Sequence, residues 1–586
     1  MANQITVGTY LTTRLEQLGV NHLFAVPGDY TSDFLEIVDQ QSTIERIGNC
    51  NELNAGYAAD GYARANGLGA MAVTTGVGAF SALNAIGGAY VEKIPVVLII
   101  GTLSNTKLLQ EMNEAELYHH QVNDTDFNKT VFKEVTVAFE RISNPMAAPA
   151  QIDAVITACI SQSRPAALEI MEDCYYMPCP APEGTLAPVA SYESFAVLQQ
   201  MAATEPPNKY AAQIVKAVND SADAIYGQLV ASKRPILLAG KDIGTQRLQS
   251  KFQQLLDAIQ APFATSLLGK SVIAENNAWY IGQWDNVFTQ PYTASIADSN
   301  DCLIGLGVWN TDLNNFGPPN VTPNDAAPIF ASREMVKVGG KQYAQVSLEN
   351  LMDALIERIR TKGYNPVWNQ PPGNPPMPAI PSPTDVITYD HFFDVMSNYL
   401  RPEHILVSEI GLSTFGGSSF LKTKRQNGYL GQNIWASIGW SVPAGLGASF
   451  TPDSRTIVTV GDGAFKLTCQ AISTMVMEKR NTVVFVFNNK VYAVEQILLD
   501  PKPFETGSNA PFEAANVLQQ WDYVSLMNAF SNNDTSAGKS ANVNTVADLQ
   551  QILASIDQNP NAAWLVNINL NERDYPIAWK RFVPGS

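Results

Sequence analysis

The pattern of apolar and polar residues is most regular near the carboxy-terminal end of the chain, where two apolar runs flank a helical pattern. Residues 456–460 and 482–487 are nearly uninterrupted apolar or β-branched runs, which predicts two buried strands. Between them, apolar residues recur at helical spacing: Phe465, Leu467, Ile472, Met475 and Val476. We therefore expect a strand–turn–helix–strand unit, a crossover that places both strand ends at the same edge of a parallel sheet.

The same alternation of apolar runs and helical patterns recurs along the rest of the chain. The clearest further strands are expected at residues 22–26, 70–75, 96–101, 234–239, 301–306, 405–408 and 563–568. Strands that alternate with helices are typical of α/β proteins with mostly parallel sheets flanked by helices. The sequence therefore predicts an α/β fold with such a sheet in each of three domains.

Two proline-rich stretches divide the chain. The first covers residues 178–188, and the second, residues 365–383, holds eight prolines without a periodic pattern. The second stretch is typical of an extended surface linker. We expect domains at 1–185, 186–365 and 385–586, each near the usual domain size, with a linker at 366–384.

Composition and charge narrow the functional classes. With 46% hydrophobic and 16% charged residues, the 586-residue chain is expected to have well-buried cores and extensive subunit contacts. A net charge of −18 argues against nucleic acid or an anionic membrane as a partner. No apolar run reaches membrane-spanning length, and the start of the chain does not resemble a secretion signal. The six cysteines lack metal-site spacing, so we expect reduced core thiols and a cytoplasmic location.

Polar residues follow both strands of the carboxy-terminal unit. Gly461-Asp462-Gly463 follows the first strand, and Asn488-Asn489 ends the second after a 24-residue gap. Asp462 offers a carboxylate and Asn489 an amide oxygen, while the glycines let the backbone approach a phosphate at a helix start. This combination suits Mg²⁺, which takes few protein ligands and completes its shell with phosphate and water. For the first motif alone, an Asp462 that caps the helix is the competing interpretation.

These motifs carry a family resemblance. The spacing of Gly461-Asp462-Gly463 and Asn488-Asn489 resembles the cofactor signature of thiamine diphosphate enzymes. Residues 51–64, which include Glu52, look like the glutamate-bearing helix of that family. Residues 24–30, 118–120 and 492–495 are similar to the non-oxidative 2-oxo acid decarboxylases, which act on pyruvate, indolepyruvate, phenylpyruvate or branched-chain 2-oxo acids. The resemblance spans both ends of the chain and is weakest between about residues 185 and 380.

The resemblance implies thiamine diphosphate and Mg²⁺ as cofactors. It names the three domains: pyrimidine-binding, central and diphosphate-binding. The implied reaction is the non-oxidative decarboxylation of a 2-oxo acid to an aldehyde and carbon dioxide, through a cofactor ylide and an enamine. Implied metal ligands are Asp462, Asn489 and the carbonyl of Val491. The family usually has glycine where Val491 stands, and since valine disfavours a positive φ, we expect altered metal geometry.

Further residues match the family's cofactor contacts. Glu52 would hydrogen-bond the aminopyrimidine ring, and its apolar neighbours predict that it is buried. The carbonyl of Ala436 would accept a bond from the pyrimidine amino group. Ile438 would be the bulky wedge that bends the cofactor, with plain core packing as the alternative. The remaining implied contacts are Thr74, Val77, Ile410, Gly463, Ala464 and Tyr492, of which Ile410 replaces a residue that often carries a hydroxyl.

Four residues match the family's catalytic positions. Asp29, His119, His120 and Glu495 are implied in substrate binding, protonation and aldehyde release. An adjacent histidine pair suits proton delivery near neutral pH. The competing interpretations are a surface or capping role for the histidines and a turn role for Asp29.

Substrate preference is implied by Thr414, Phe415, Val494 and Leu498. Thr414 stands where pyruvate-specific members tend to carry a bulky aromatic residue. Val494 likewise implies a larger pocket. Smaller residues enlarge a pocket. We therefore expect a pocket that admits aromatic or branched 2-oxo acids and also pyruvate.

The resemblance implies a homodimer as the smallest functional unit, with Glu52 and Asp462 of different chains facing each other. A homotetramer of paired dimers is expected. A carboligase such as acetolactate synthase is a rival, although it is not expected to carry the histidine pair and Glu495. A non-catalytic scaffold is a second rival, favoured only by Val491 and Ile410. A nicotinamide dehydrogenase is disfavoured because no GxGxxG with a following acidic residue comes after a strand.

Overall fold

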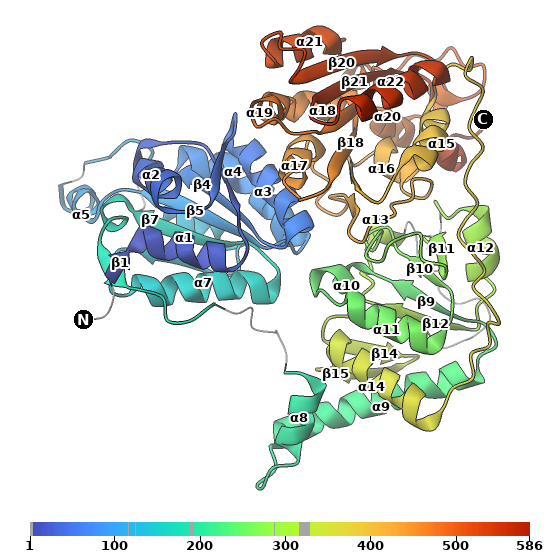
Figure 1. Ribbon diagram of the computed structural model, residues 1–586, viewed down its shortest axis with the longest axis horizontal. Helices are drawn as coiled ribbons and strands as arrows, with labels where there is room; N and C mark the ends of the chain where they lie inside the picture. Colours follow the sequence, from blue (N-terminus) through green and yellow to red (C-terminus); the bar gives the residue numbers. More distant parts are fainter. Residues whose placement is uncertain are drawn as a thin grey trace.

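The structure is a computed structural model that describes residues 4–114, 116–122, 125–186, 193–285, 287–315 and 328–585. In this described part of the chain, strands form three large sheets flanked by helices (Figure 1). Each sheet falls within one of the three predicted segments, which confirms the α/β architecture. The exact domain bounds stay predictions.

The amino-terminal sheet has the order β3-β2-β4-β5-β7-β6, and its strands pair in parallel. Every residue of β4 and β5 is buried, because helices cover both faces of a parallel sheet. The strands are β2 His22–Ala25, β3 Glu45–Gly48, β4 Gly69–Thr74, β5 Val96–Thr102, β6 Phe139–Ile142 and β7 Ala166–Met171, with the antiparallel pair β1 Gln4–Thr6 and β8 Pro178–Pro180 beside them. The helices are α1 Val7–Gln17, α2 Ser32–Gln41, α3 Glu52–Asn66, α4 Val77–Val91, α5 Asn105–Glu114, α6 Phe127–Phe132 and α7 Ala148–Gln162.

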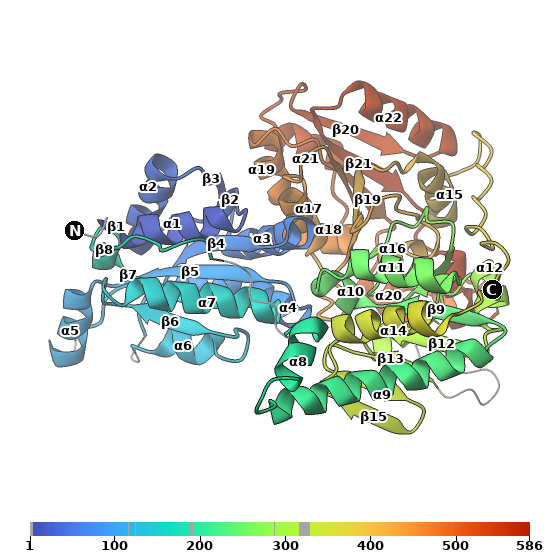
Figure 2. The same ribbon diagram turned by 60° about the horizontal axis from the view of Figure 1, so that its bottom comes forward.

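The central sheet has the order β11-β10-β9-β12-β13-β14-β15, with the last two strands antiparallel to their neighbours. Its strands are β9 Pro235–Ala239, β10 Phe263–Thr265, β11 Tyr280–Gln283, β12 Cys302–Leu306, β13 Ile329–Ala331, β14 Met335–Val338 and β15 Lys341–Ala344. Its helices are α8 Phe195–Ala202, α9 Lys209–Ala231, α10 Lys241–Thr245, α11 Gln249–Ile259, α12 Pro291–Ala297, α13 Asp312–Asn315 and α14 Leu348–Lys362. The long α9 lies along the antiparallel strands β14 and β15 (Figure 2).

The carboxy-terminal sheet has the order β17-β16-β18-β19-β21-β20, again paired in parallel. Its strands are β16 His404–Ser408, β17 Tyr429–Leu430, β18 Arg455–Gly461, β19 Val483–Asn488, β20 Gly538–Val543 and β21 Ala563–Asn569. Its helices are α15 Tyr389–Tyr399, α16 Leu412–Gly417, α17 Ser441–Ala448, α18 Asp462–Thr468, α19 Ala471–Met477, α20 Ala493–Leu499, α21 Tyr523–Phe530 and α22 Val546–Gln558. All the strands expected from the apolar runs are present, with ends shifted by no more than one residue.

The single helix expected between β18 and β19 is instead two short helices, α18 and α19. The amide groups of Ile472 and Ser473 donate to the carbonyls of Cys469 and Gln470, three residues back. Such tight bonds replace the four-residue spacing of an α-helix and change its direction. Apolar periodicity continues across the break, which is why the sequence pattern does not reveal it.

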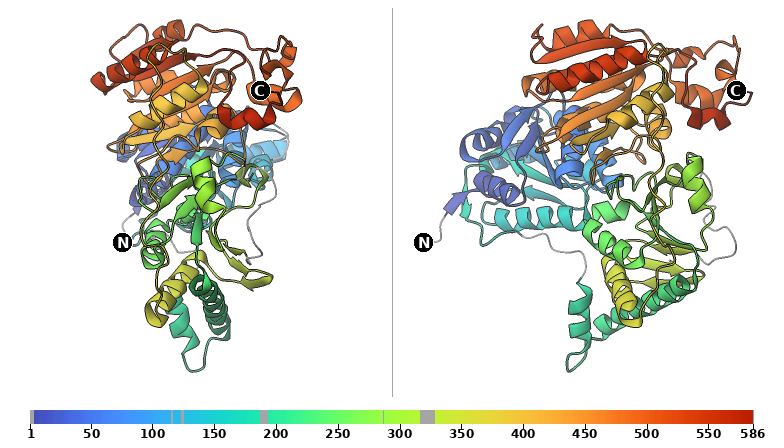
Figure 3. Two further views of the ribbon diagram at one scale, coloured as in Figure 1. Left: turned by 90° about the vertical axis from the view of Figure 1, so that its right-hand side faces the viewer. Right: turned by 45° about the vertical axis from the view of Figure 1, so that its right-hand side comes forward.

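The amino- and carboxy-terminal domains of one chain pack together through α3 and α17 (Figures 1 and 3). A Cβ added at Gly61 would overlap the backbone of Ala444, and one added at Gly447 would overlap that of Ala58. The two helices therefore meet backbone to backbone, which only glycine permits. Apolar residues of both domains, among them Tyr57, belong to one buried cluster.

The connection from α14 to α15 crosses the outside of the molecule (Figure 1). Residues 366–384 contain neither helix nor strand, and most are exposed or half-buried. No helix in the described ranges is both long and apolar enough to cross a membrane. All six cysteines are free and five are buried, but Cys50 is exposed, so the expectation of core thiols is wrong for that residue.

Candidate active site

The amino-terminal half of the candidate site lies at the carboxyl edge of its sheet. Asp29 begins a short 3-10 helix soon after β2, and Glu52 is the first residue of α3 after β3. Thr74 ends β4 and Val77 begins α4. Parallel strands bring their carboxyl ends to one edge, and this is where open α/β folds bind ligands.

Asp29, His119 and His120 form one cluster. His119 Nε2 lies 2.5 Å from Asp29 Oδ2, and His120 Nε2 lies 3.9 Å from Asp29 Oδ1. The ring of Tyr30 stacks on His119 with ring centres 5.0 Å apart. Burial alone would raise the pKa of Asp29, but the hydrogen bond with His119 and its charge lower that pKa below its usual value. The structure thus brings Asp29 next to a histidine pair that begins 90 positions later in the sequence. It also adds Tyr30, which the sequence analysis did not place in the site.

The position of His120 depends on a glycine in the turn before α4. Gly76 has φ +61°, and a Cβ added there would overlap the backbone carbonyl oxygen of His120. His120 itself has φ +64°. This close approach fixes the histidine loop against the start of α4. Gly76 lies between the predicted contacts Thr74 and Val77, but nothing in the local pattern signals that it meets a distant loop.

Glu52 and Thr74 lie at the same edge of the sheet. Glu52 is half-buried in the single chain, so the expectation of a fully buried side chain is not met. A Cβ added at Gly78 would lie 3.3 Å from Glu52 Oε1, so the carboxyl reaches the first turn of α4. The hydroxyl of Thr74 is buried and has no hydrogen-bond partner among the described residues. Val77, which begins α4, is 55% exposed.

The carboxy-terminal half of the site is built at the ends of β18 and β19. Asp462 is only 2% exposed, and its two carboxylate oxygens accept from the backbone N–H of Gly463 at 3.0 Å and of Lys490 at 2.9 Å. Burial raises the pKa of Asp462 to about 6. Asn489 is also buried, and its amide nitrogen has no partner in the described part of the chain. The turns after the two strands therefore meet at one edge, although Asp462 does not act as an N-cap because α18 begins with it.

The backbone after Asn489 shows that Val491 does not need the positive φ that valine disfavours. The residue with positive φ in this turn is Lys490, at +67°, and Val491 is not in the left-handed region. Val491 is buried and bridges to Val517 in an isolated antiparallel pair. The valine therefore adopts an ordinary backbone here. Its role as a metal ligand stays a prediction.

The other predicted cofactor contacts of this domain surround the same edge. Gly463 packs directly against the ring of Tyr492, and Ala464 is buried in α18. Ala436 has φ +55°. Ile438 is 40% exposed, so core packing does not explain it in the single chain.

Two of the predicted substrate-pocket residues are buried in the chain. Thr414 has no exposed surface, and its hydroxyl contacts Glu409 O at 2.8 Å and the hydroxyl of Tyr429 at 3.2 Å. Phe415 is 5% exposed and stacks on Phe288 with ring centres 5.6 Å apart. The space opposite Thr414 is therefore occupied by Tyr429, an effect that the local sequence does not signal.

The other pocket and catalytic residues of this domain lie on α20. A Cβ added at Gly411 would touch Val494 at 3.7 Å. Leu498 is 64% exposed, and Glu495 is exposed as well. In the described part of the chain, no hydrogen bond or ion pair joins Glu495 to the histidine cluster of the same chain. Their meeting stays a prediction that requires a second chain.

The donors at the two edges fit the implied cofactors. The buried side chains of Asp462 and Asn489 offer a carboxylate oxygen and an amide oxygen, the ligand types that Mg²⁺ takes. The unpaired Thr74 hydroxyl beside Glu52 offers hydrogen bonds to a polar ring.

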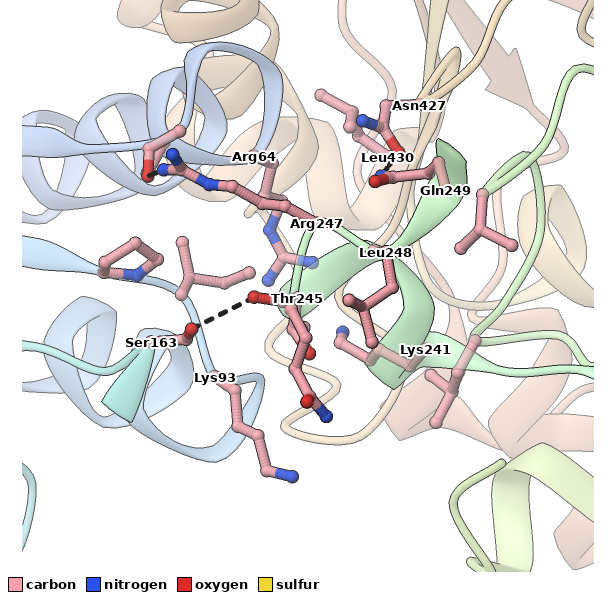
Figure 4. Close-up of a pocket in the computed structure, with 18 of the residues that line it drawn as sticks. Arg64, Lys93, Ser163, Lys241, Thr245, Arg247, Leu248, Gln249, Asn427 and Leu430 are labelled. Atoms are coloured by element: carbon pink, nitrogen blue, oxygen red, sulfur yellow. Dashed lines mark hydrogen bonds between the residues drawn. The ribbon is translucent and has the colours of Figure 1, made fainter. Parts of the chain in front are cut away.

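A cavity lies elsewhere in the molecule. It has a volume of about 570 Å³ and lies between the three domains (Figure 4). Among its lining residues are Arg64, Lys93 and Lys241, which pair with carboxylates: Arg64 with Asp60 at 2.6 Å, Lys93 with Asp242 at 3.3 Å and Lys241 with Glu92. None of the predicted site residues lines it. This cavity is a junction of paired charges between domains, separate from the candidate site.

Comparison with known proteins identifies the family. Three family profiles match: "Thiamine pyrophosphate enzyme, N-terminal TPP binding domain" at residues 5–123, the corresponding "central domain" at 222–358 and the "C-terminal TPP binding domain" at 409–564. An alpha-keto-acid decarboxylase of Mycolicibacterium paratuberculosis is 30% identical over 97% of this chain and 95% of its own. The chain belongs to the thiamine diphosphate-dependent 2-oxo acid decarboxylase family. The family and the enzyme class expected from the motifs are thereby confirmed.

Two further proteins that are similar to this decarboxylase support the same family assignment. A probable pyruvate decarboxylase of Schizosaccharomyces pombe is 29% identical over 97% of this chain and 94% of its own. The crystal structure of benzoylformate decarboxylase from Polynucleobacter necessarius matches with a TM-score of 0.75 at 17% identity, covering 98% of this chain and 100% of that one. The structural likeness supports the fold of the decarboxylase, and the sequence relatives support its activity.

Proposed function

We propose that this decarboxylase converts aromatic or branched 2-oxo acids, and pyruvate as well, to an aldehyde and carbon dioxide. The observation that carries the proposal is the cluster of Asp29, His119 and His120 at the carboxyl edge of the first sheet. A histidine held by a carboxylate is a proton donor and acceptor in the neutral range, which decarboxylation to an aldehyde requires.

The two cofactors have distinct places in the proposal. Thiamine diphosphate, when bound, supplies a nucleophilic carbon and an electron sink. Asp462, Asn489 and the carbonyl of Val491 would hold Mg²⁺ and, through it, the diphosphate. Glu52 would hold the pyrimidine ring, with the Ala436 carbonyl accepting from its amino group and Ile438 pressing between the two rings.

The protein's own residues would control the proton. The short contact with Asp29 orients the His119 ring. His120 Nε2 lies 3.9 Å from the other carboxylate oxygen, so the two histidines would act as a pair in transferring a proton to the product. Val494 and Leu498 would exclude water from the substrate carboxylate, which favours its loss as uncharged carbon dioxide.

We also propose a homodimer in which each site is shared by two chains, with paired dimers forming a tetramer. Several apolar residues predicted to touch the cofactor or substrate are open to solvent in the single chain: Val77 is 55% exposed, Ile438 40% and Leu498 64%. Apolar surface of this kind marks a partner or ligand site. The free cysteines support a reducing, cytoplasmic location.

The test is direct. The purified protein is supplied with thiamine diphosphate, Mg²⁺ and a panel of aromatic, branched and short 2-oxo acids, and aldehyde, carbon dioxide and acyloins are measured. Equimolar aldehyde and carbon dioxide support the proposal. Acyloin or acetolactate as the main product would identify a carboligase instead, and the absence of cofactor binding by calorimetry would favour a scaffold.

A further inference from the structure

Glu409 is a buried acid that none of the proposed roles uses. It directly follows β16 and is 1% exposed. Its Oε1 accepts from the backbone N–H of Ile410 at 3.1 Å. Its Oε2 accepts from the N–H of Gly439 at 3.2 Å, and from both the N–H and the hydroxyl of Ser441 at 3.1 and 2.7 Å. One carboxylate therefore ties the end of β16 to a turn 30 residues further along the chain.

That turn presents Ile438. The backbone carbonyl of Gly439 accepts from the Thr468 hydroxyl at 2.5 Å, and Gly439 has φ +90°. On the other side of Ile438, Ser437 donates its N–H to Gln432 at 3.1 Å and its hydroxyl contacts Tyr57 at 2.6 Å. The residues on both sides of Ile438 are thus fixed, while its side chain remains 40% exposed. An exposed isoleucine on a backbone that is fixed on both sides is well placed to contact a ligand or a second chain.

We propose that Glu409 is a positioning residue for the cofactor. Its carboxylate holds the turn from Gly439 to Ser441, and so fixes where Ile438 stands, while it also orients the backbone at Ile410. This inference rests on the proposed function, because Ile438 and Ile410 are contacts of the cofactor there. It assigns to Glu409 no contact with substrate or cofactor.

The chemistry of the contacts explains why the residue is an acid. All four groups that reach Glu409 are donors, so the site requires an acceptor on each oxygen. In Glu409→Gln, the side-chain amide places N–H groups at one of the two oxygen positions. If the amide oxygen keeps the three bonds of the turn, the NH₂ group faces the N–H of Ile410 and the backbone there must move; in the other orientation the turn loses its two backbone N–H bonds to residue 409. A shift of about 1 Å in a residue that aligns reacting groups costs about 100-fold in rate.

The experiment separates positioning from general stability. Cofactor affinity is measured by calorimetry with thiamine diphosphate and Mg²⁺, and alignment by the rate of hydrogen–deuterium exchange at the reactive carbon of the bound cofactor, without substrate. For Glu409→Gln we expect affinity within about 3-fold of wild type but exchange slower by about 10- to 100-fold. Ser441→Ala, which removes one donor and leaves the backbone bond, should slow exchange by only a few fold and remains informative if Glu409→Gln does not fold.

A double-mutant cycle that combines Glu409→Gln with Ile438→Ala tests whether Glu409 acts on the cofactor through Ile438. If Glu409 acts through Ile438, the double variant exchanges no more slowly than the slower single variant. Additive losses, or a lower melting temperature with normal exchange, would overturn the inference while leaving the proposed function intact. Failure of the wild-type protein to bind the cofactor would instead remove the proposed function, and the inference with it.

Discussion

The two halves of the candidate site are built in opposite ways. In the amino-terminal half, the side chains of Asp29 and His119 are 50% and 58% exposed, and they contact each other. In the carboxy-terminal half, Asp462 and Asn489 are 2% exposed and stand directly at the ends of two buried strands. The half expected to bind the cofactor is thus part of the core, whereas the half expected to transfer protons is largely outside it. Damage to the two halves should therefore be distinguishable.

The largest effect is expected from Glu52→Gln. The variant keeps the shape of the side chain but removes the carboxyl that would share a proton with the pyrimidine ring, so kcat should fall by about 10²- to 10⁴-fold. Aldehyde formation at saturating cofactor is the measurement. A kcat within 10-fold of wild type would remove Glu52 from its assigned role.

Asp462→Asn tests the gripping half. Loss of the carboxylate should weaken Mg²⁺-dependent cofactor binding by about 100-fold. At a cofactor concentration of 100 times the wild-type Kd, this removes most of the roughly 2.7 kcal/mol by which binding stabilises the fold. Thermal melts with and without thiamine diphosphate and Mg²⁺ measure the difference. An unchanged cofactor-induced rise in Tm would contradict the metal site.

His119→Ala is the counterpart in the exposed half. We expect kcat to fall by about 10²-fold because proton delivery is lost, with the cofactor-induced rise in Tm unchanged. If the variant loses cofactor binding as strongly as Asp462→Asn, the division between the two halves does not hold.

The smallest effect is expected from a change at Asp285, a buried acid outside the candidate site that serves as a control. Asp285 is buried in the central domain, and burial raises its pKa from the ordinary 3.8 to about 6. The folded state therefore binds a proton that the unfolded state releases. The stability linked to that proton is fully present below about pH 4 and is lost as the pH rises through 6. The difference corresponds to about 3 kcal/mol at most.

For Asp285→Asn we therefore expect a higher Tm at pH 8, by about 1–3 °C, and little change near pH 4. The gain should be the same with and without cofactor, unlike the effect of Asp462→Asn. Differential scanning calorimetry at the two pH values is the measurement. A gain that appears only at low pH would reverse the assigned sign.

The sequence predicts the buried half of the site better than the exposed half, for a physical reason. Apolar periodicity reports burial, so it identifies β18 and β19 and thus the turns that carry Asp462 and Asn489. It does not report which distant loops meet. The family resemblance alone brought Asp29, His119 and His120 together.

The same limit applies to the contacts that the sequence did not predict. Tyr30 and Gly76 fix the histidines through contacts across 40 or more positions. Glu409 follows an apolar strand much as Asp462 does, but nothing in its local pattern signals a bond to Ser441. Long-range pairing of polar groups depends on the finished topology, which a local pattern does not contain.

The contact between α3 and α17 constrains how this chain can recombine with relatives. Where two backbones touch at Gly61 and Gly447, each helix is shaped for one opposite surface, and a side chain on either glycine has no space. The first and last thirds of the chain must therefore change together if this contact is to be kept, despite the roughly 200 residues between them. A chimera that exchanges only one of these two thirds must keep the contacts of Gly61 with Ala444 and of Gly447 with Ala58. An exchange of the middle third leaves these contacts unchanged.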